Sequence, residues 1–210
     1  MRHFIATSIT AATLALGIGS ALPAAAADAP ATVSVTVQQT QDALRDLWVG
    51  HIFWVRNVVT ATLAGNTAEA KAAEDAAVAN ARSIADAVVP FYGKDAGDAL
   101  FKLLAGHYTA IKEYLVAKNP AGEKAAFDKL VANANQIAKF LHGANPKNWP
   151  EDVLVSLLMG HGGHHVQQIK QLRAKDYKGE AETWEAMKNH MYTIADALAG
   201  GLAAQFPDKF

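Results

Sequence analysis

Three histidines recur in the same short context along the chain. His51, His107 and His161 each close a Leu-x-x-Gly-His segment, and the spacings between them are 56 and 54 residues. Neutral imidazole is a preferred ligand of zinc, copper, nickel and iron. Three protein ligands around one open position is the arrangement of many catalytic zinc sites. The repeated histidine therefore predicts either a transition-metal site or a set of polar groups that the fold must pair internally.

The third of these segments carries further imidazoles. It continues as Gly160-His161-Gly162-Gly163-His164-His165. Side chains four residues apart lie on one face of a helix, so His161 and His165 point the same way. We therefore add His165 to the candidate metal ligands, and we expect His164 to lie at the surface.

A second pattern follows each histidine segment. Asn80, Asn133 and His190 each open a stretch that ends in Ile-Ala, and each is in helical register with apolar neighbours. An unpaired buried polar group costs roughly 1–3 kcal/mol, so these groups must find partners. We take Asn80 and Asn133 as candidate ligand-binding residues and His190 as a further candidate metal ligand. Trp54, close to Arg56, is a third candidate for contact with a bound cofactor or small ligand.

The elements that position these residues are helical. Apolar residues around each histidine recur every three or four positions, and Gly65-Asn66, Asn119-Pro120 and Asn145-Pro146 interrupt the pattern. The alanine-rich composition favours helix as well. We predict an all-α, six-helix bundle built from three antiparallel αα-hairpin repeats of about 55 residues. The hairpins would span 42–93, 96–145 and 150–207 of a single domain, 42–210.

The beginning of the chain predicts export. Residues 1–27 combine a short basic start, an apolar uncharged run and small residues typical of a cleavage site, which together indicate a signal peptide. Residues 28–41 read as an extended lead-in. We expect a periplasmic or secreted protein that is not bound to the membrane after cleavage.

Composition removes several classes of function. The chain of 210 residues has a formal net charge of −1, which argues against a nucleic-acid partner. It contains no cysteine, so disulfides, thiolate metal sites and cysteine catalysis are excluded. No phosphate-binding loop of the G-x-x-x-x-G-K-[ST] type is present, so kinase motifs are absent.

Three interpretations stay open at this point. In the first, the protein is a non-enzymatic binding protein whose inward histidines hold a Zn, Cu, Ni or Fe ion or another small ligand. In the second, it is a structural or interaction module, and each histidine forms a hydrogen-bonded lock with the asparagine, or in the third hairpin the histidine, of its own hairpin. In the third, His51, His107 and His161 surround an open position in a metal-dependent enzyme.

The chain also resembles a known family from residue 47 to its end. The family comprises small bacterial all-helical proteins, most of them uncharacterised, which automated annotation often labels acetylglutamate kinase. In that family the position of His190 is usually an uncharged amide. The resemblance implies a helical fold and the marked positions, but no established activity. The elements that carry it are Leu47-Trp48 with His51, Tyr92-Gly93, Leu104 with His107, Asn133-Ala134, Trp149, Leu158 with His161, Ala195-Asp196 and Gln205-Phe206-Pro207.

Overall fold

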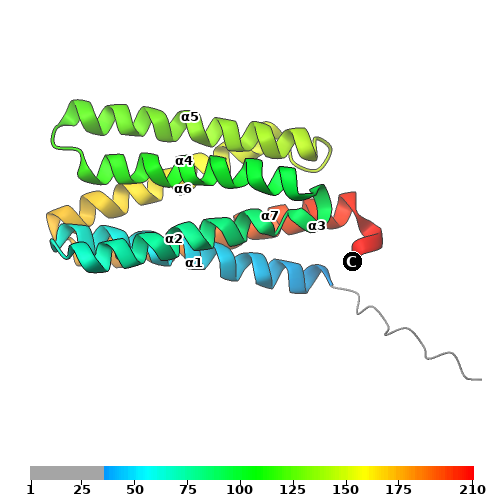
Figure 1. Cartoon of the computed structure of the whole chain (residues 1–210), viewed down its shortest axis with the longest axis horizontal. Helices are drawn as coiled ribbons and strands as arrows, with labels where there is room; N and C mark the ends of the chain where they lie inside the picture. Colours follow the sequence, from blue (N-terminus) through cyan, green and yellow to red (C-terminus); the bar gives the residue numbers. More distant parts are fainter. Residues whose placement is uncertain (1–35) are drawn as a thin grey trace, which may run out of the picture. The chain divides into compact units, whose positions relative to one another are not determined.

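Residues 36–210 are described by a computed structural model, in which the chain runs almost entirely through helices (Figure 1). Six long helices dominate it, and the described part of the chain contains no strand. The elements are α1 (Val37–Leu63), α2 (Thr67–Asp86), the short α3 (Val89–Tyr92), α4 (Lys94–Val116), α5 (Pro120–Ala144), α6 (Glu151–Ala174), α7 (Tyr177–Gln205) and the 3₁₀ turn η1 (Pro207–Lys209).

The expected extended lead-in ends earlier than predicted. Helix α1 begins at Val37, so the last residues of the segment 28–41 are helical. The reason is a capping box: the Thr36 hydroxyl accepts from the Gln39 N–H, and the Gln39 side chain accepts from the Thr36 N–H at 2.8 Å. The predicted signal peptide, 1–27, lies outside the described residues.

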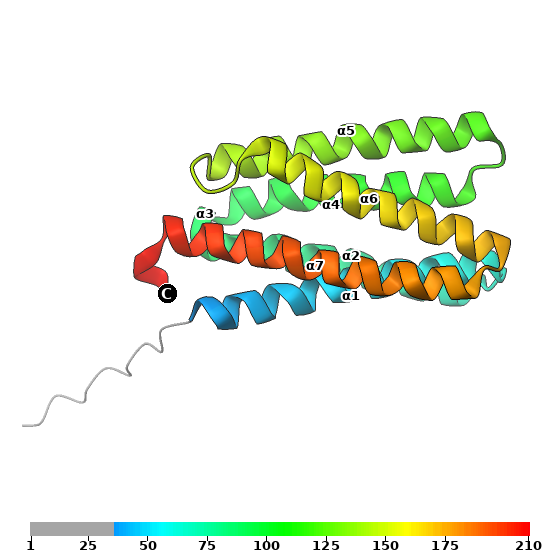
Figure 2. The same cartoon turned by 180° about the vertical axis from the view of Figure 1, so that it is seen from behind.

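The long helices pack in a closed sequence of neighbours. Helix α1 packs on α2, α2 on α4, α4 on α5, α5 on α6, α6 on α7, and α7 returns to α1. Helix α6 also contacts α1 and α4, and its ribbon slants from the end of α5 towards α7 (Figure 2). Three helices, α1, α4 and α6, are therefore in a position to bring side chains to a shared interior.

The apolar core is divided into two clusters along the helices. One contains Trp48 of α1, Leu104 of α4 and Leu158 of α6. The other includes later residues of the same helices, for instance Ile111 and Ile169. On α4 and α6 the histidines fall between the residues of the two clusters in sequence, and on α1 His51 precedes Ile52, the last residue of the first cluster on that helix. The histidines thus interrupt an otherwise continuous apolar interior.

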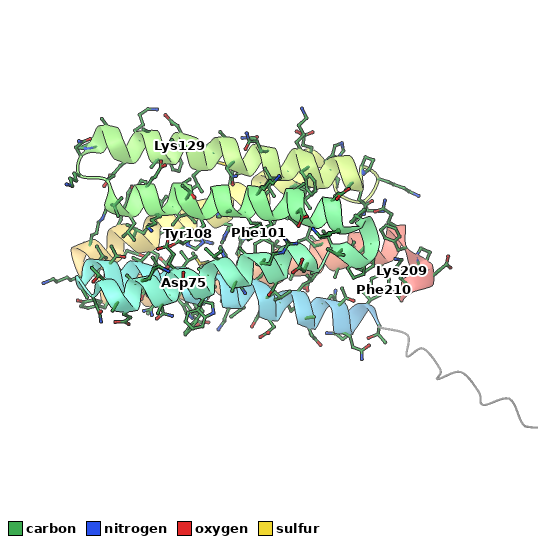
Figure 3. All side chains as sticks on the ribbon, in the orientation of Figure 1. Asp75, Phe101, Tyr108, Lys129, Lys209 and Phe210 are labelled. Atoms are coloured by element: carbon green, nitrogen blue, oxygen red, sulfur yellow. The ribbon has the colours of Figure 1, made fainter. Side chains whose placement is uncertain are left out.

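The end of the chain packs back onto the short helix α3. The rings of Phe210 and Phe91 stack with centroids 5.8 Å apart, and the Lys209 ammonium donates to the Pro90 carbonyl. Figure 3 shows side chains filling the spaces between the helices, with Phe101 and Tyr108 of α4 labelled among them. Within residues 36–210, no helix combines the length and the hydropathy needed to cross a bilayer.

Candidate metal centre

Four histidines meet at the centre of the bundle. They are His51 of α1, His107 of α4, and His161 and His165 of α6, and each offers a ring nitrogen within 4.8 Å of those of the other three. None of the four side chains is more than 5% exposed. We call this group the His tetrad. It contains four of the five predicted metal ligands.

The geometry of the tetrad is that of a compact ligand cage. Neighbouring ring centroids lie between 4.5 and 6.2 Å apart. The closest nitrogens are Nε2 of His161 and Nε2 of His165, at 3.2 Å. Two nitrogens on one tetrahedral ion, each bonded at about 2.0–2.1 Å, are separated by about 3.3 Å. The separation within this pair therefore suits a shared ion as well as it suits a hydrogen bond between two imidazoles.

Burial keeps the tetrad neutral. Desolvation lowers the pKa of His51 to about 3, with the neighbouring His107 lowering it further. Desolvation lowers the pKa of His107 to about 4. Burial and the mutual repulsion of the rings hold the pKa values of His161 and His165 well below 6.5. At neutral pH each ring thus keeps an unprotonated nitrogen, which is the state that binds a transition metal.

Several nitrogens of the tetrad have no partner. Nε2 of His51, both ring nitrogens of His107 and Nδ1 of His161 are buried and make no hydrogen bond with the rest of the chain. Most buried polar groups in proteins are paired, so unpaired ones call for an explanation. Imidazole nitrogens are the donor set that Zn, Cu, Ni and Fe accept. The residues present therefore fit a transition-metal ion.

The glycine that precedes each repeated histidine has a definite role. The Asn80 amide donates from Nδ2 to the Leu47 carbonyl at 3.0 Å, and the Asn133 amide donates likewise to Leu103 at 2.9 Å. A Cβ at Gly50 would lie 3.0 Å from the Asn80 amide nitrogen. A Cβ at Gly106 would be 3.1 Å from that of Asn133. Glycine thus lets the polar side chain of the next helix reach the backbone beside each histidine.

The third histidine segment shows the same contact with a different side chain. His190 Nε2 lies 2.7 Å from the Leu157 carbonyl, and a Cβ at Gly160 would be 3.2 Å from the His190 ring. His190 therefore contacts a backbone carbonyl through Nε2 and does not belong to the tetrad. Its ring neighbours that of His164, with centroids 5.4 Å apart, so His164 is half-buried rather than a surface residue.

The predicted lock between histidine and asparagine takes another form. Asn80 and Asn133 bond to leucine carbonyls, and neither makes a hydrogen bond of normal geometry to a histidine. Their Oδ1 atoms are buried without a partner. The Asn133 amide is still near enough to the His107 ring to oppose the lowering of its pKa. Asn133 thus lies beside His107, Asn80 bonds to the backbone of the helix that carries His51, and both keep a free acceptor.

The two tryptophans of α1 differ in their exposure and in their distance from the tetrad. Trp54, a predicted ligand-binding residue, is 36% exposed and packs edge-on against the exposed Phe53 ring, away from the tetrad. Trp48 is buried in the apolar core, and its ring also meets those of His51 and His161 edge-on at about 6 Å. Its spacing of three residues before His51 is the sequence signal that places it on the same helical face.

A second buried polar group, the Glu180 cluster, was not foreseen. Glu180 of α7 is 3% exposed and accepts two hydrogen bonds from Arg56, at 2.6 and 2.8 Å. The Gln168 amide of α6 donates a third at 2.8 Å. Hydrogen bonding from Arg56 holds the pKa of Glu180 below its usual value. This carboxylate is already neutralised, which leaves it little to offer a metal ion.

Comparison with known proteins adds no assignment: no family model, no curated protein and no solved structure matches the chain.

Proposed function

We propose that this protein is an exported, non-enzymatic binding protein that holds one divalent transition-metal ion in the His tetrad. The single observation that carries the proposal is the set of four buried imidazoles whose ligand atoms lie within 4.8 Å of one another. The ion would be Zn, Cu, Ni or Fe. Export rests on the predicted signal peptide, 1–27, and implies a periplasmic or secreted site of action.

The void beside the tetrad favours binding over catalysis. It measures about 10 Å³ and is lined by Trp48, Leu104 and Leu158 together with three of the histidines. A single water needs about 10–15 Å³, so an organic substrate would not fit without movement of the helices. This argues against the alternative in which the same histidines form the centre of a hydrolase or oxygenase.

The two asparagines could accept hydrogen bonds from the ring nitrogens that do not bind the ion. A histidine that ligates a metal usually donates its other ring N–H to an oxygen, which fixes the orientation of the ring. The free Oδ1 atoms of Asn80 and Asn133 are acceptors of this kind, and both side chains bond to the backbone of the helix that carries a tetrad histidine, α1 for Asn80 and α4 for Asn133. We propose that they orient His51 and His107 when the ion is bound.

The arrangement also supports three hairpin repeats. In each proposed hairpin a polar side chain of the second helix bonds to the leucine carbonyl four residues before the histidine of the first helix. Three repeats would deliver one histidine each to a common centre, and His165 would be the addition that makes a fourth ligand. The hairpins are those predicted from the sequence: 42–93, 96–145 and 150–207.

Metal analysis of untagged protein tests the proposal. We expect one ion per chain by elemental analysis, and a rise in thermal stability when metal-free protein receives Zn²⁺, Cu²⁺, Ni²⁺ or, without oxygen, Fe²⁺. A ligand at 100 times its dissociation constant stabilises the folded state by about 2.7 kcal/mol. His107→Ala should abolish both the bound metal and the metal-dependent shift.

The matched control is His142→Ala. His142 lies on α5, and its Nδ1 is 2.8 Å from the Trp149 carbonyl, outside the tetrad. This variant should keep one ion per chain. Absence of bound metal in the parent protein, with no thermal shift from any of the four ions, would overturn the proposal and favour a purely structural polar core.

A further inference from the structure

An apolar cavity adjoins the His tetrad. It measures about 40 Å³ and is lined by leucine, isoleucine, valine, alanine and tryptophan side chains from all six long helices. Five residues line both this cavity and the smaller void at the tetrad, so the two spaces are separated by a shared wall. The shared residues are Trp48, Ile84, Leu104, Ile137 and Leu158.

The lining of the cavity disfavours water. A buried water needs two to four polar partners, and apolar cavities in proteins stay dry. Of the two tryptophans in the lining, Trp149 donates its indole N–H to the Ala197 carbonyl at 3.1 Å. Trp48 Nε1 is buried without a partner, and it offers at most one donor. An uncharged, weakly polar occupant suits such walls better than water does.

The size of the cavity limits its occupant. One water requires about 10–15 Å³, whereas an apolar cavity of about 150 Å³ accommodates benzene or xenon. A space of about 40 Å³ lies between these values. It has room for a molecule of two or three heavy atoms but not for an aromatic ring.

The shared wall is thin enough to place a molecule in the cavity near the imidazoles. Trp48 contacts the rings of His51 and His161 with ring centroids 6.2 and 6.1 Å away. Leu104 and Leu158 precede the histidines of their own helices by three residues, and both line the two spaces. A molecule in the cavity would therefore lie one side chain away from the tetrad.

We propose that this cavity is a binding site for a small uncharged molecule of the diatomic-gas class, such as dioxygen or nitric oxide. The site is distinct from the tetrad and requires no metal. Its position would let a gas molecule reach the histidine centre through the wall formed by Trp48, Leu104 and Leu158, without passing through water.

The test uses the metal-free mature chain, kept in chelator, with xenon and then dioxygen as probes. Methyl resonances are recorded by NMR as the gas pressure rises. We expect saturable xenon shifts at Leu104, Ile137 and Leu158, and paramagnetic broadening of the same methyls by dioxygen. Methyls of the other apolar cluster, such as those of Ile111 and Ile169, should not respond.

Two alanine substitutions on α7 provide matched variants. Ala197→Leu places three extra carbons in the lining and should remove the xenon shifts. Ala186→Leu adds the same carbons at an exposed position of the same helix and should leave the shifts unchanged.

The outcomes separate this inference from the metal proposal. A parent protein that binds metal but shows no saturable shift at the cavity methyls would overturn the gas site alone. Shifts spread evenly over both apolar clusters would overturn it too. A protein that takes up xenon at these methyls but retains no metal would support the cavity while the metal proposal fails.

Discussion

The His tetrad and the Glu180 cluster are both polar groups inside an apolar bundle, but they differ in how many of their buried atoms have a hydrogen-bond partner. Glu180 meets Arg56 and Gln168, so the carboxylate has three hydrogen bonds from within the chain. The tetrad has one hydrogen bond between its own members, and four of its nitrogens have no partner. A buried polar group that is hydrogen-bonded by neighbouring residues needs no ligand to account for it. A group of four adjacent imidazoles left largely unpaired calls for an explanation, and a bound ion would supply one.

The largest expected difference between the His tetrad and the Glu180 cluster is in how acid changes the free energy of unfolding. Because the folded-state pKa values of the tetrad lie below 6.5, the unfolded chain binds more protons than the folded chain once the pH falls below that value. The free energy of unfolding therefore decreases as the pH falls from 6.5 towards about 4. Each histidine contributes up to about 1.4 kcal/mol per pH unit.

Urea unfolding of metal-free protein at several pH values between 7 and 4.5 measures this loss. The Glu180 cluster should contribute almost nothing in the upper part of that window, where the carboxylate is ionised in both the folded and the unfolded chain. As the pH approaches 4.5, the unfolded carboxyl begins to bind a proton while the lowered pKa keeps the folded one ionised, so the cluster adds a smaller loss there. His107→Leu should reduce the dependence of the free energy of unfolding on pH by the contribution of one histidine. A stability that is flat between pH 6.5 and 4.5 would contradict the buried, neutral tetrad.

Removing a partner from the Glu180 cluster should have the next largest effect. Arg56→Met deletes both guanidinium hydrogen bonds and leaves a buried carboxylate with Gln168 alone. Breaking a buried ion pair in this way costs about 3 kcal/mol. Chemical denaturation at pH 7 gives the free energy of unfolding, and the metal content of the variant should match that of the parent.

A surface ion pair supplies the control for Arg56→Met. Lys71 and Asp75 pair along the exposed face of α2 at 2.6 Å. Exposed pairs of this kind contribute little to stability, so Lys71→Met should be close to neutral. Equal destabilisation by the two variants would show that the Arg56–Glu180 pair behaves as a surface contact.

The smallest expected effect has the opposite sign. His107→Leu replaces an unpaired polar ring by an apolar side chain of similar size. It should raise the free energy of unfolding of metal-free protein by about 1 kcal/mol, because an unsatisfied buried group is removed. Thermal denaturation in chelator checks the sign. A loss as large as that of Arg56→Met would mean that the imidazole is fully hydrogen-bonded in the metal-free protein.

Helical periodicity found much of the fold and of the tetrad. The three-four spacing around each histidine placed His51, His107 and His161 on inward faces, and the four-residue spacing added His165. Local signals also marked the helix ends, although the capping box at Thr36 was missed and with it the true start of α1. These features succeed because they depend on residues that are neighbours along one helix.

The features that helical spacing does not predict involve partners on different helices. Trp54 has the residue type of a ligand-binding side chain, but the rotation of α1 within the bundle leaves it exposed. His190 shares the inward register of Asn80 and Asn133, yet it bonds to a carbonyl across the helix interface. Glu180 looks like an ordinary surface acid until Arg56, which is 124 residues away, is brought beside it. No local pattern contains that information.

The sequence by itself determined that this protein is helical, that it contains no thiolate ligand, and that its repeated histidines face inward. Composition and the spacing of residues within single helices are sufficient for those conclusions. Only the tertiary structure decided that four imidazoles converge, that the asparagines bond to backbone carbonyls, and that an apolar cavity lies beside the His tetrad. Those depend on the distances between helices, which the packing of all six long helices sets together.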